Sequence, residues 1–160
     1  MYKCNRFILK ELVWRGIYKE YQDEQWILWR KFDINLLKTI DTLAENYGIT
    51  IINNWAFDTP YLGKQFLEYS GARPLDCPDG AKDSTHKNWD TADLKFKKLA
   101  HLGFPTIKEE YDALREHIID HPECYPYVTT IESGEYAPTW LHLSTGNFRN
   151  EDGSIRIIKP

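Results

Sequence analysis

Two histidines and one aspartate are the residues of this chain whose types and spacing could do chemistry. His86 and Asp93 lie close together in the sequence, and His142 follows near the C-terminal end. Two neutral imidazoles and one carboxylate are the ligands with which proteins hold a catalytic zinc, leaving the fourth coordination position to water. The sequence therefore predicts a Zn²⁺ site whose ligands are His86, Asp93 and His142.

Both segments that carry these ligands alternate apolar and polar residues. Asp93 lies in Ala-Asp-Leu-Lys-Phe (residues 92–96), and His142 lies in Thr-Trp-Leu-His-Leu-Ser (residues 139–144). This alternation is typical of short strands. Strands paired in one sheet can point alternate side chains at a single metal, so we expect both segments to be neighbours in a small sheet.

Helices are predicted mainly before these strands. The predicted helices cover residues 7–21, residues 34–47, and a segment that opens at the capping box Thr106–Glu109 and ends before Pro122. In the second helix the apolar positions on one face are Ile34, Leu37, Ile40, Leu43 and Ala44. Residues 49–52 and 128–132 are predicted strands, the latter forming a final hairpin with the strand of His142. Long helices followed by a small antiparallel sheet predict an α+β fold.

Length and composition set the class of protein. The chain has 160 residues, of which 42% are hydrophobic, and shows no linker or repeat, so we expect a single domain over residues 1–160. A net charge of −4 without a Lys/Arg cluster argues against a nucleic-acid-binding protein. No stretch approaches the roughly 20 apolar residues of a membrane span. No nucleic acid and no membrane span are therefore expected.

The N-terminal residues and the cysteines bear on the compartment. Residues 1–11 carry three basic side chains and lack the apolar core of a signal peptide. Cys4, Cys77 and Cys124 are odd in number and widely spaced, which fits no disulfide framework. We therefore expect synthesis in a reducing cytoplasm without a signal peptide.

The pattern around the ligands resembles the M15 family of zinc peptidases, which includes D-alanyl-D-alanine carboxypeptidases and related phage endolysins. The family motif Ser-x-His-x-x-Gly-x-Ala-x-Asp is matched by Ser84, His86 and Asp93, with Trp89 where glycine is usual and Thr91 where alanine is usual. The family's second motif, an aromatic-x-His, is matched by Trp140-Leu141-His142, and Ser70-Gly71-Ala72-Arg73 fits a further Ser-Gly-x-Arg element.

This resemblance implies a fold and an activity. The fold would be hedgehog/D-Ala-D-Ala peptidase-like, with the zinc site on the small sheet. The activity would be hydrolysis of peptidoglycan stem peptides or cross-links at the bacterial cell wall, as in a phage lysin or a virion component. Glu132, on the strand before His142, would be the general base. Arg73 and Ser84 would bind substrate or support the ligands.

Several alternatives stay open. Glu135, in the turn after Glu132, competes for the role of base. Arg73 is alternatively an ordinary surface residue without a role in substrate binding. Trp140 is expected to face away from the site as a packing residue. His117 and His121 lie four residues apart on a predicted helix, a zinc-ligand spacing, but positions in the last turns favour a role at the helix terminus.

Two function classes follow. The first is a zinc peptidase, with exo or endo cleavage and D,D or L,D specificity both open. The second is a non-catalytic module of the same fold that uses zinc for stability and binds wall peptide or a protein. Glu132 separates them, because a binding module has no need of a general base.

Overall fold

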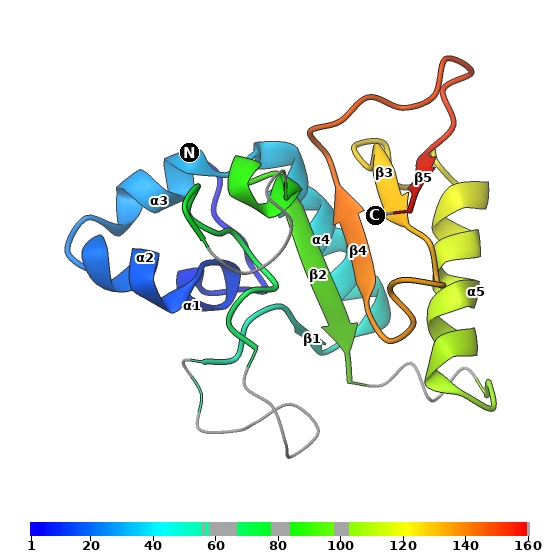
Figure 1. The fold of residues 1–160 in the computed structure, drawn as a ribbon, viewed down its shortest axis with the longest axis horizontal. Coiled ribbons are helices and arrows are strands. Elements are labelled where there is room, and N and C mark those ends of the chain that lie inside the picture. Colours follow the sequence, from blue (N-terminus) through cyan, green and yellow to red (C-terminus); the bar gives the residue numbers. More distant parts are fainter. Residues whose placement is uncertain (56, 58–66, 78–83, 98–102, 160) are drawn as a thin grey trace.

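The structure is a mixed α+β domain in which five short strands form one sheet beside helices, counted over the described residues (Figure 1). The computed structural model describes residues 1–55, 57, 67–77, 84–97 and 103–159. The helices are α1 (Leu9–Leu12), α2 (Arg15–Glu20), α3 (Gln25–Lys31), α4 (Ile34–Tyr47) and α5 (Ile107–Asp120), with a 3₁₀ turn η1 (Thr85–Asn88). The strands are β1 (Thr50–Ile51), β2 (Thr91–Phe96), β3 (Thr130–Glu132), β4 (Leu141–Ser144) and β5 (Arg156–Ile158).

The sheet has the strand order β1-β2-β4-β3-β5. The neighbours β1 and β2, β2 and β4, and β4 and β3 pair antiparallel, which confirms the predicted hairpin of β3 and β4. The expectation of a purely antiparallel sheet was wrong at one edge, because β5 pairs parallel with β3. Sequence reasoning missed β5 because this edge strand is only three residues long, too short to show a strand period, and both Arg156 and Ile157 are exposed.

Helix α4 has the predicted bounds. Asp33 caps its start, where the side-chain Oδ1 accepts from the backbone N–H of Asn35 at 2.9 Å, and Gly48 ends it at φ 84°. Its inward face differs by one position from the prediction: Ile34 is 47% exposed, whereas Leu36 is buried. The helix passes behind β2 and β4 and covers the apolar face of the sheet (Figure 1).

Helix α5 also follows the sequence signal. The Thr106 hydroxyl accepts from the Glu109 backbone N–H at 3.2 Å, and Tyr111, Leu114 and Ile118 are buried as expected. The predicted helix over residues 7–21 is instead two helices, α1 and α2. Val13 between them has extended backbone angles because it forms a bridge with Ala72, a pairing partner far away in the sequence.

Alternation along the strands separates a core face from a polar face. The core face of the sheet contains the buried residues Ala92, Leu94, Phe96, Ile131, Leu141 and Leu143, which join the buried residues of α4 and α5 in one cluster. Each buried leucine contributes roughly 1.5–3 kcal/mol relative to an exposed one. The opposite face presents Thr91, Asp93, Lys95 and His142. The fold thus supplies a rigid platform for polar side chains.

None of the described helices is long and apolar enough to cross a membrane.

Candidate metal centre

Asp93, His142 and Glu132 form one row across three adjacent strands. Asp93 and His142 are direct partners in the β2–β4 ladder. Ile131 pairs with Leu143, so Glu132, one residue further along β3, lies opposite His142. Directly opposed residues have Cβ atoms about 4.5–5.5 Å apart on one face of the sheet. Strand register alone therefore brings two of the predicted ligands and the predicted base together.

His86 approaches this row from η1, the turn that precedes β2. Its side chain is buried, and its Nδ1 lies 3.0 Å from the carbonyl oxygen of Gly71. Because a carbonyl only accepts, Nδ1 carries the proton and Nε2 is the ring nitrogen with the free lone pair. That Nε2 points at Asp93, with 3.5 Å to Oδ1. A carbonyl behind a histidine is the usual device that orients a metal ligand.

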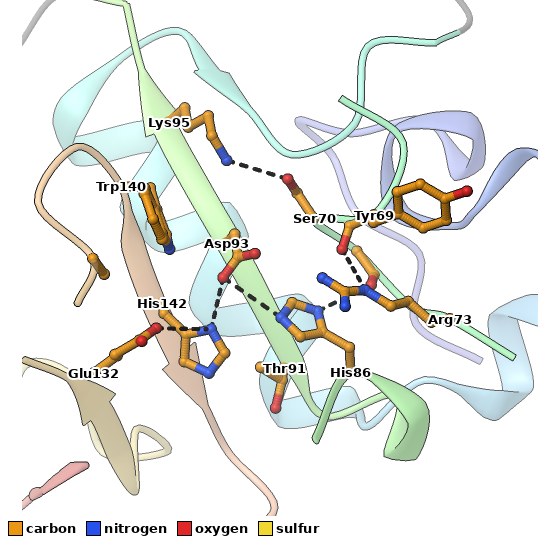
Figure 2. Close-up of polar contacts among 12 residues, drawn as sticks. Tyr69, Ser70, Arg73, His86, Thr91, Asp93, Lys95, Glu132, Trp140 and His142 are labelled. Carbon is orange, nitrogen blue, oxygen red and sulfur yellow. Dashed lines mark hydrogen bonds and ion pairs between the residues drawn. The ribbon is translucent and has the colours of Figure 1, made fainter. Parts of the chain in front are cut away.

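The three predicted ligands converge (Figure 2). His142 Nδ1 lies 2.6 Å from Asp93 Oδ1, and the rings of His86 and His142 are 5.1 Å apart at 67°. One ligand atom from each of the three residues lies within 4.8 Å of the others. No second group of three His, Cys, Asp or Glu side chains in the described ranges meets this spacing. Two imidazole nitrogens and one carboxylate oxygen, with His86 oriented from behind by the Gly71 carbonyl, fit a divalent metal.

Charges within the cluster shift the pKa values of Asp93 and His142. Burial by itself raises the pKa of Asp93, but the two imidazoles overcome this and hold that pKa well below its usual range. Burial of His142 opposes its protonation, yet the hydrogen bond and charge of Asp93 raise its pKa above the ordinary value. A carboxylate that stays ionised is the form that a metal requires.

Glu132 lies at the edge of the cluster, and Glu135 does not. Glu132 is buried, with Oε2 3.6 Å from His142 Nδ1, and burial raises the pKa of its carboxyl group. Glu135 is exposed and lies 3.9 Å from Lys159 Nζ. Of the two glutamates that sequence reasoning left open, the structure brings only Glu132 to the histidines.

The other two predicted site residues differ in placement. The Arg73 backbone N–H donates to the His86 carbonyl at 3.2 Å, and its side-chain Nε donates to the Tyr69 carbonyl at 2.5 Å. Figure 2 shows the Arg73 guanidinium beside the His86 ring. Ser84 is the N-cap of η1, and its side chain makes no capping bond; only its carbonyl is engaged, by the N–H of Lys87 at 3.1 Å. Arg73 thus lies at the centre, while Ser84 shapes the turn that carries His86.

Trp89 occupies the left-handed region of backbone space. It ends η1 at φ 65° and is the only non-glycine residue with positive φ in the described chain. Glycine is the ordinary residue for such a conformation, as the family pattern has it at this position. The Trp89 ring packs edge-on against Phe32, with 4.9 Å between the centroids, so it fills the core rather than narrowing the centre.

Trp140 lies on the cluster face, contrary to the expectation that it faces away. It precedes His142 by two residues, and the period of two in a strand puts both on one side. The Lys95 ammonium lies 5.6 Å from the centroid of its ring. Sequence reasoning missed Lys95, although the same period of two from Asp93 pointed to it.

Arg115 is a further residue that no sequence signal singled out. From α5, its Nε donates to the Glu132 carbonyl at 3.1 Å and its Nη2 donates to the Trp140 carbonyl at 2.5 Å. A buried guanidinium thus holds both ends of the β3–β4 connection, and with them the spacing between Glu132 and His142.

The rival pair His117 and His121 lies at the end of α5, away from the cluster. Their rings are 4.7 Å apart, both residues are exposed, and His121 contacts Glu123 at 3.3 Å. The helix-terminus interpretation fits this placement.

No family model, curated protein or solved structure matches this chain, so the family resemblance rests on the motif residues alone.

Proposed function

We propose that this protein is a zinc-dependent peptidase with a hedgehog/D-Ala-D-Ala peptidase-like fold, acting on the stem peptides of the bacterial cell wall. The observation that carries the proposal is the convergence of His86, Asp93 and His142, with Glu132 next to His142 in the cross-strand row. The motif resemblance supplies the substrate class. A phage lysin or a virion component is the biological setting that we favour.

The reaction needs an activated water, a proton carrier and a stabilised oxyanion. His86, Asp93 and His142 would hold the zinc, which would supply a water with a pKa lowered toward about 7 and would polarise the scissile carbonyl. Glu132 accepts the proton of that water as its oxygen bonds to the carbonyl carbon. As the C–N bond breaks, Glu132 returns the proton to the leaving nitrogen, which departs as an amine. General acid–base catalysis of this kind contributes about 10²–10⁴-fold.

The surroundings of Glu132 suit this exchange. Its raised pKa, caused first by burial, brings the carboxyl group closer to the working pH than an exposed glutamate. Arg115 holds its backbone from behind at 3.1 Å. On the other side of the cluster, the Arg73 guanidinium provides a fixed positive charge for the oxygen of the scissile carbonyl.

Metal content measured beside wall-peptide cleavage tests this proposal. We expect about one zinc per chain in the wild type, its loss in His142→Ala, and its retention in the matched control His121→Ala, which changes an exposed histidine. Purified muropeptides should be cleaved by the wild type, and a chelator should stop the cleavage. Stoichiometric zinc without cleavage would favour the binding module, and absence of zinc would refute both.

A further inference from the structure

Lys95 places a buried positive charge on the same face as the metal centre. It follows Asp93 by two residues on β2, and the register puts it opposite Trp140. The residue is 9% exposed, and its Nζ donates to the Ser70 hydroxyl at 3.2 Å. Figure 2 shows the ammonium in the space between Ser70 and Trp140. The charge is thus held in place by a hydroxyl and an aromatic ring.

No carboxylate among the described residues forms a close ion pair with this charge, although the charge of Asp93 attracts it from further away. An ammonium has three N–H donors, and Ser70 is the one hydrogen-bond acceptor that the described chain gives it. No Asp or Glu oxygen in the described ranges lies within 4.0 Å of its Nζ, and Asp93 instead faces the two imidazoles. Buried charges are normally paired, because desolvation without a partner is costly. Burial lowers the pKa of the Lys95 ammonium, and the charge of Asp93 offsets this only in part. An anion from outside the chain would therefore stabilise the charged form of Lys95.

The net charge of the whole site also indicates an anionic ligand. Asp93 and Glu132 contribute two negative charges, Arg73 and Lys95 contribute two positive charges, and a bound zinc adds two more. A site with this surplus favours an anionic ligand over a neutral one.

The spacing identifies which anion fits. Lys95 lies two residues beyond Asp93, about 6.6 Å along the strand. One peptide residue spans about 3.3–3.6 Å, so an α-carboxylate one residue past the scissile carbonyl lies within reach of the four-carbon lysine side chain. A peptide continuing past the cleaved bond would instead present an amide, which leaves the ammonium unpaired. The Trp140 ring would lie beside this last residue.

From this geometry we infer that Lys95 is a specificity-determining residue that binds the free α-carboxylate of the substrate's C-terminal residue. The inference rests on the proposed peptidase function and makes the enzyme a carboxypeptidase, which removes one residue from a chain end. Arg73 and Lys95 then have separate tasks on the two sides of Asp93, the scissile carbonyl for Arg73 and the terminal carboxylate for Lys95.

Binding of a matched acid and amide tests the role of Lys95. The probes are N-acetyl-D-alanyl-D-alanine and its C-terminal amide, titrated by calorimetry into the zinc-loaded chain carrying Glu132→Gln to prevent turnover. A charge-assisted hydrogen bond predicts an acid preference of about tenfold or more. Adding Lys95→Met should bring the ratio of affinities near one, while Lys95→Arg should keep much of the preference. The control Lys97→Met, on an exposed lysine of the same segment, should leave it unchanged.

Each outcome bears on one of the two proposals. Equal binding of acid and amide, no binding of the acid, or an acid preference that survives Lys95→Met would overturn the inference. Zinc content of the Lys95→Met variant, measured in parallel, shows that the centre is intact. An acid preference carried by Lys95 without muropeptide cleavage would refute the peptidase and leave the carboxylate site. Cleavage of internal cross-links by a chain without acid preference would support the peptidase and refute the carboxylate site at Lys95.

Discussion

The carboxylate of Asp93 and the imidazole of His142 face each other as direct partners of the β2–β4 ladder, with 2.6 Å between Oδ1 and Nδ1. Their segments are far apart in the sequence, and backbone pairing alone sets their distance. Because both strands are packed against α4 on the other face, the two groups cannot separate without breaking sheet or core. The candidate metal centre is therefore preorganised by the sheet.

Asp93→Asn should abolish tight zinc binding while leaving the fold intact. The amide has nearly the shape of the carboxylate but lacks its charge, and loss of a group that merely supports a ligand already costs about 10–100-fold in metal affinity. We expect a loss of at least that size in a competitive chelator titration. Asp120→Asn, an exposed change on α5, is the matched control and should bind zinc like the wild type. Full affinity in Asp93→Asn would remove this residue from the ligand set.

Glu132→Gln should separate binding from catalysis. The variant keeps the size of the side chain but cannot accept the proton, so we expect normal zinc content and muropeptide hydrolysis reduced by about 10²–10⁴-fold. The measurement is the initial rate of product release at saturating substrate. Glu135→Gln should retain wild-type rates because that residue is exposed and faces Lys159. A reduced rate in Glu135→Gln together with a wild-type rate in Glu132→Gln would assign the base to Glu135.

Gly71→Ala should damage the centre through the backbone. A Cβ at Gly71 would lie 2.1 Å from the Leu12 carbonyl oxygen, so the segment must move. The Gly71 carbonyl orients His86 through Nδ1, and its displacement should lower zinc affinity as well as stability. We expect a loss of about 1–3 kcal/mol in urea unfolding of the metal-free protein. Wild-type stability together with wild-type affinity would contradict this role for Gly71.

Trp89→Gly sets two effects against each other. Glycine relieves the left-handed conformation, worth about 1–2 kcal/mol. It also removes a ring that packs against Phe32 in the core, and large-to-small changes of a buried tryptophan cost about 3–5 kcal/mol. The packing loss is larger, so the variant should be less stable by about 2 kcal/mol in denaturant unfolding. A variant as stable as the wild type would show that relief of backbone strain at this position offsets the whole packing loss.

Local signals in the sequence were enough to predict α4, α5 and the two strands, β2 and β4, that carry Asp93 and His142. Asp33 and Gly48 delimit α4, Thr106 opens α5, and alternation marks β2 and β4. Each signal acts between residues only a few positions apart, through a cap, a turn or the strand period. The motif spacing also singled out His86, Asp93 and His142, which the structure brings together.

Pairings between distant segments were decided only by tertiary structure. Val13 interrupts a predicted helix because Ala72 pairs with it, and β5 joins the sheet although it is too short to show a strand period of its own. The Gly71 carbonyl behind His86 and the buried charge of Lys95 beside Ser70 likewise depend on which segments meet. Strand and bridge partners are chosen by the free energy of the whole packed chain, which no local pattern encodes. The sequence thus determined which residues could hold a metal, and the tertiary structure decided how they are oriented and which charges lie beside them.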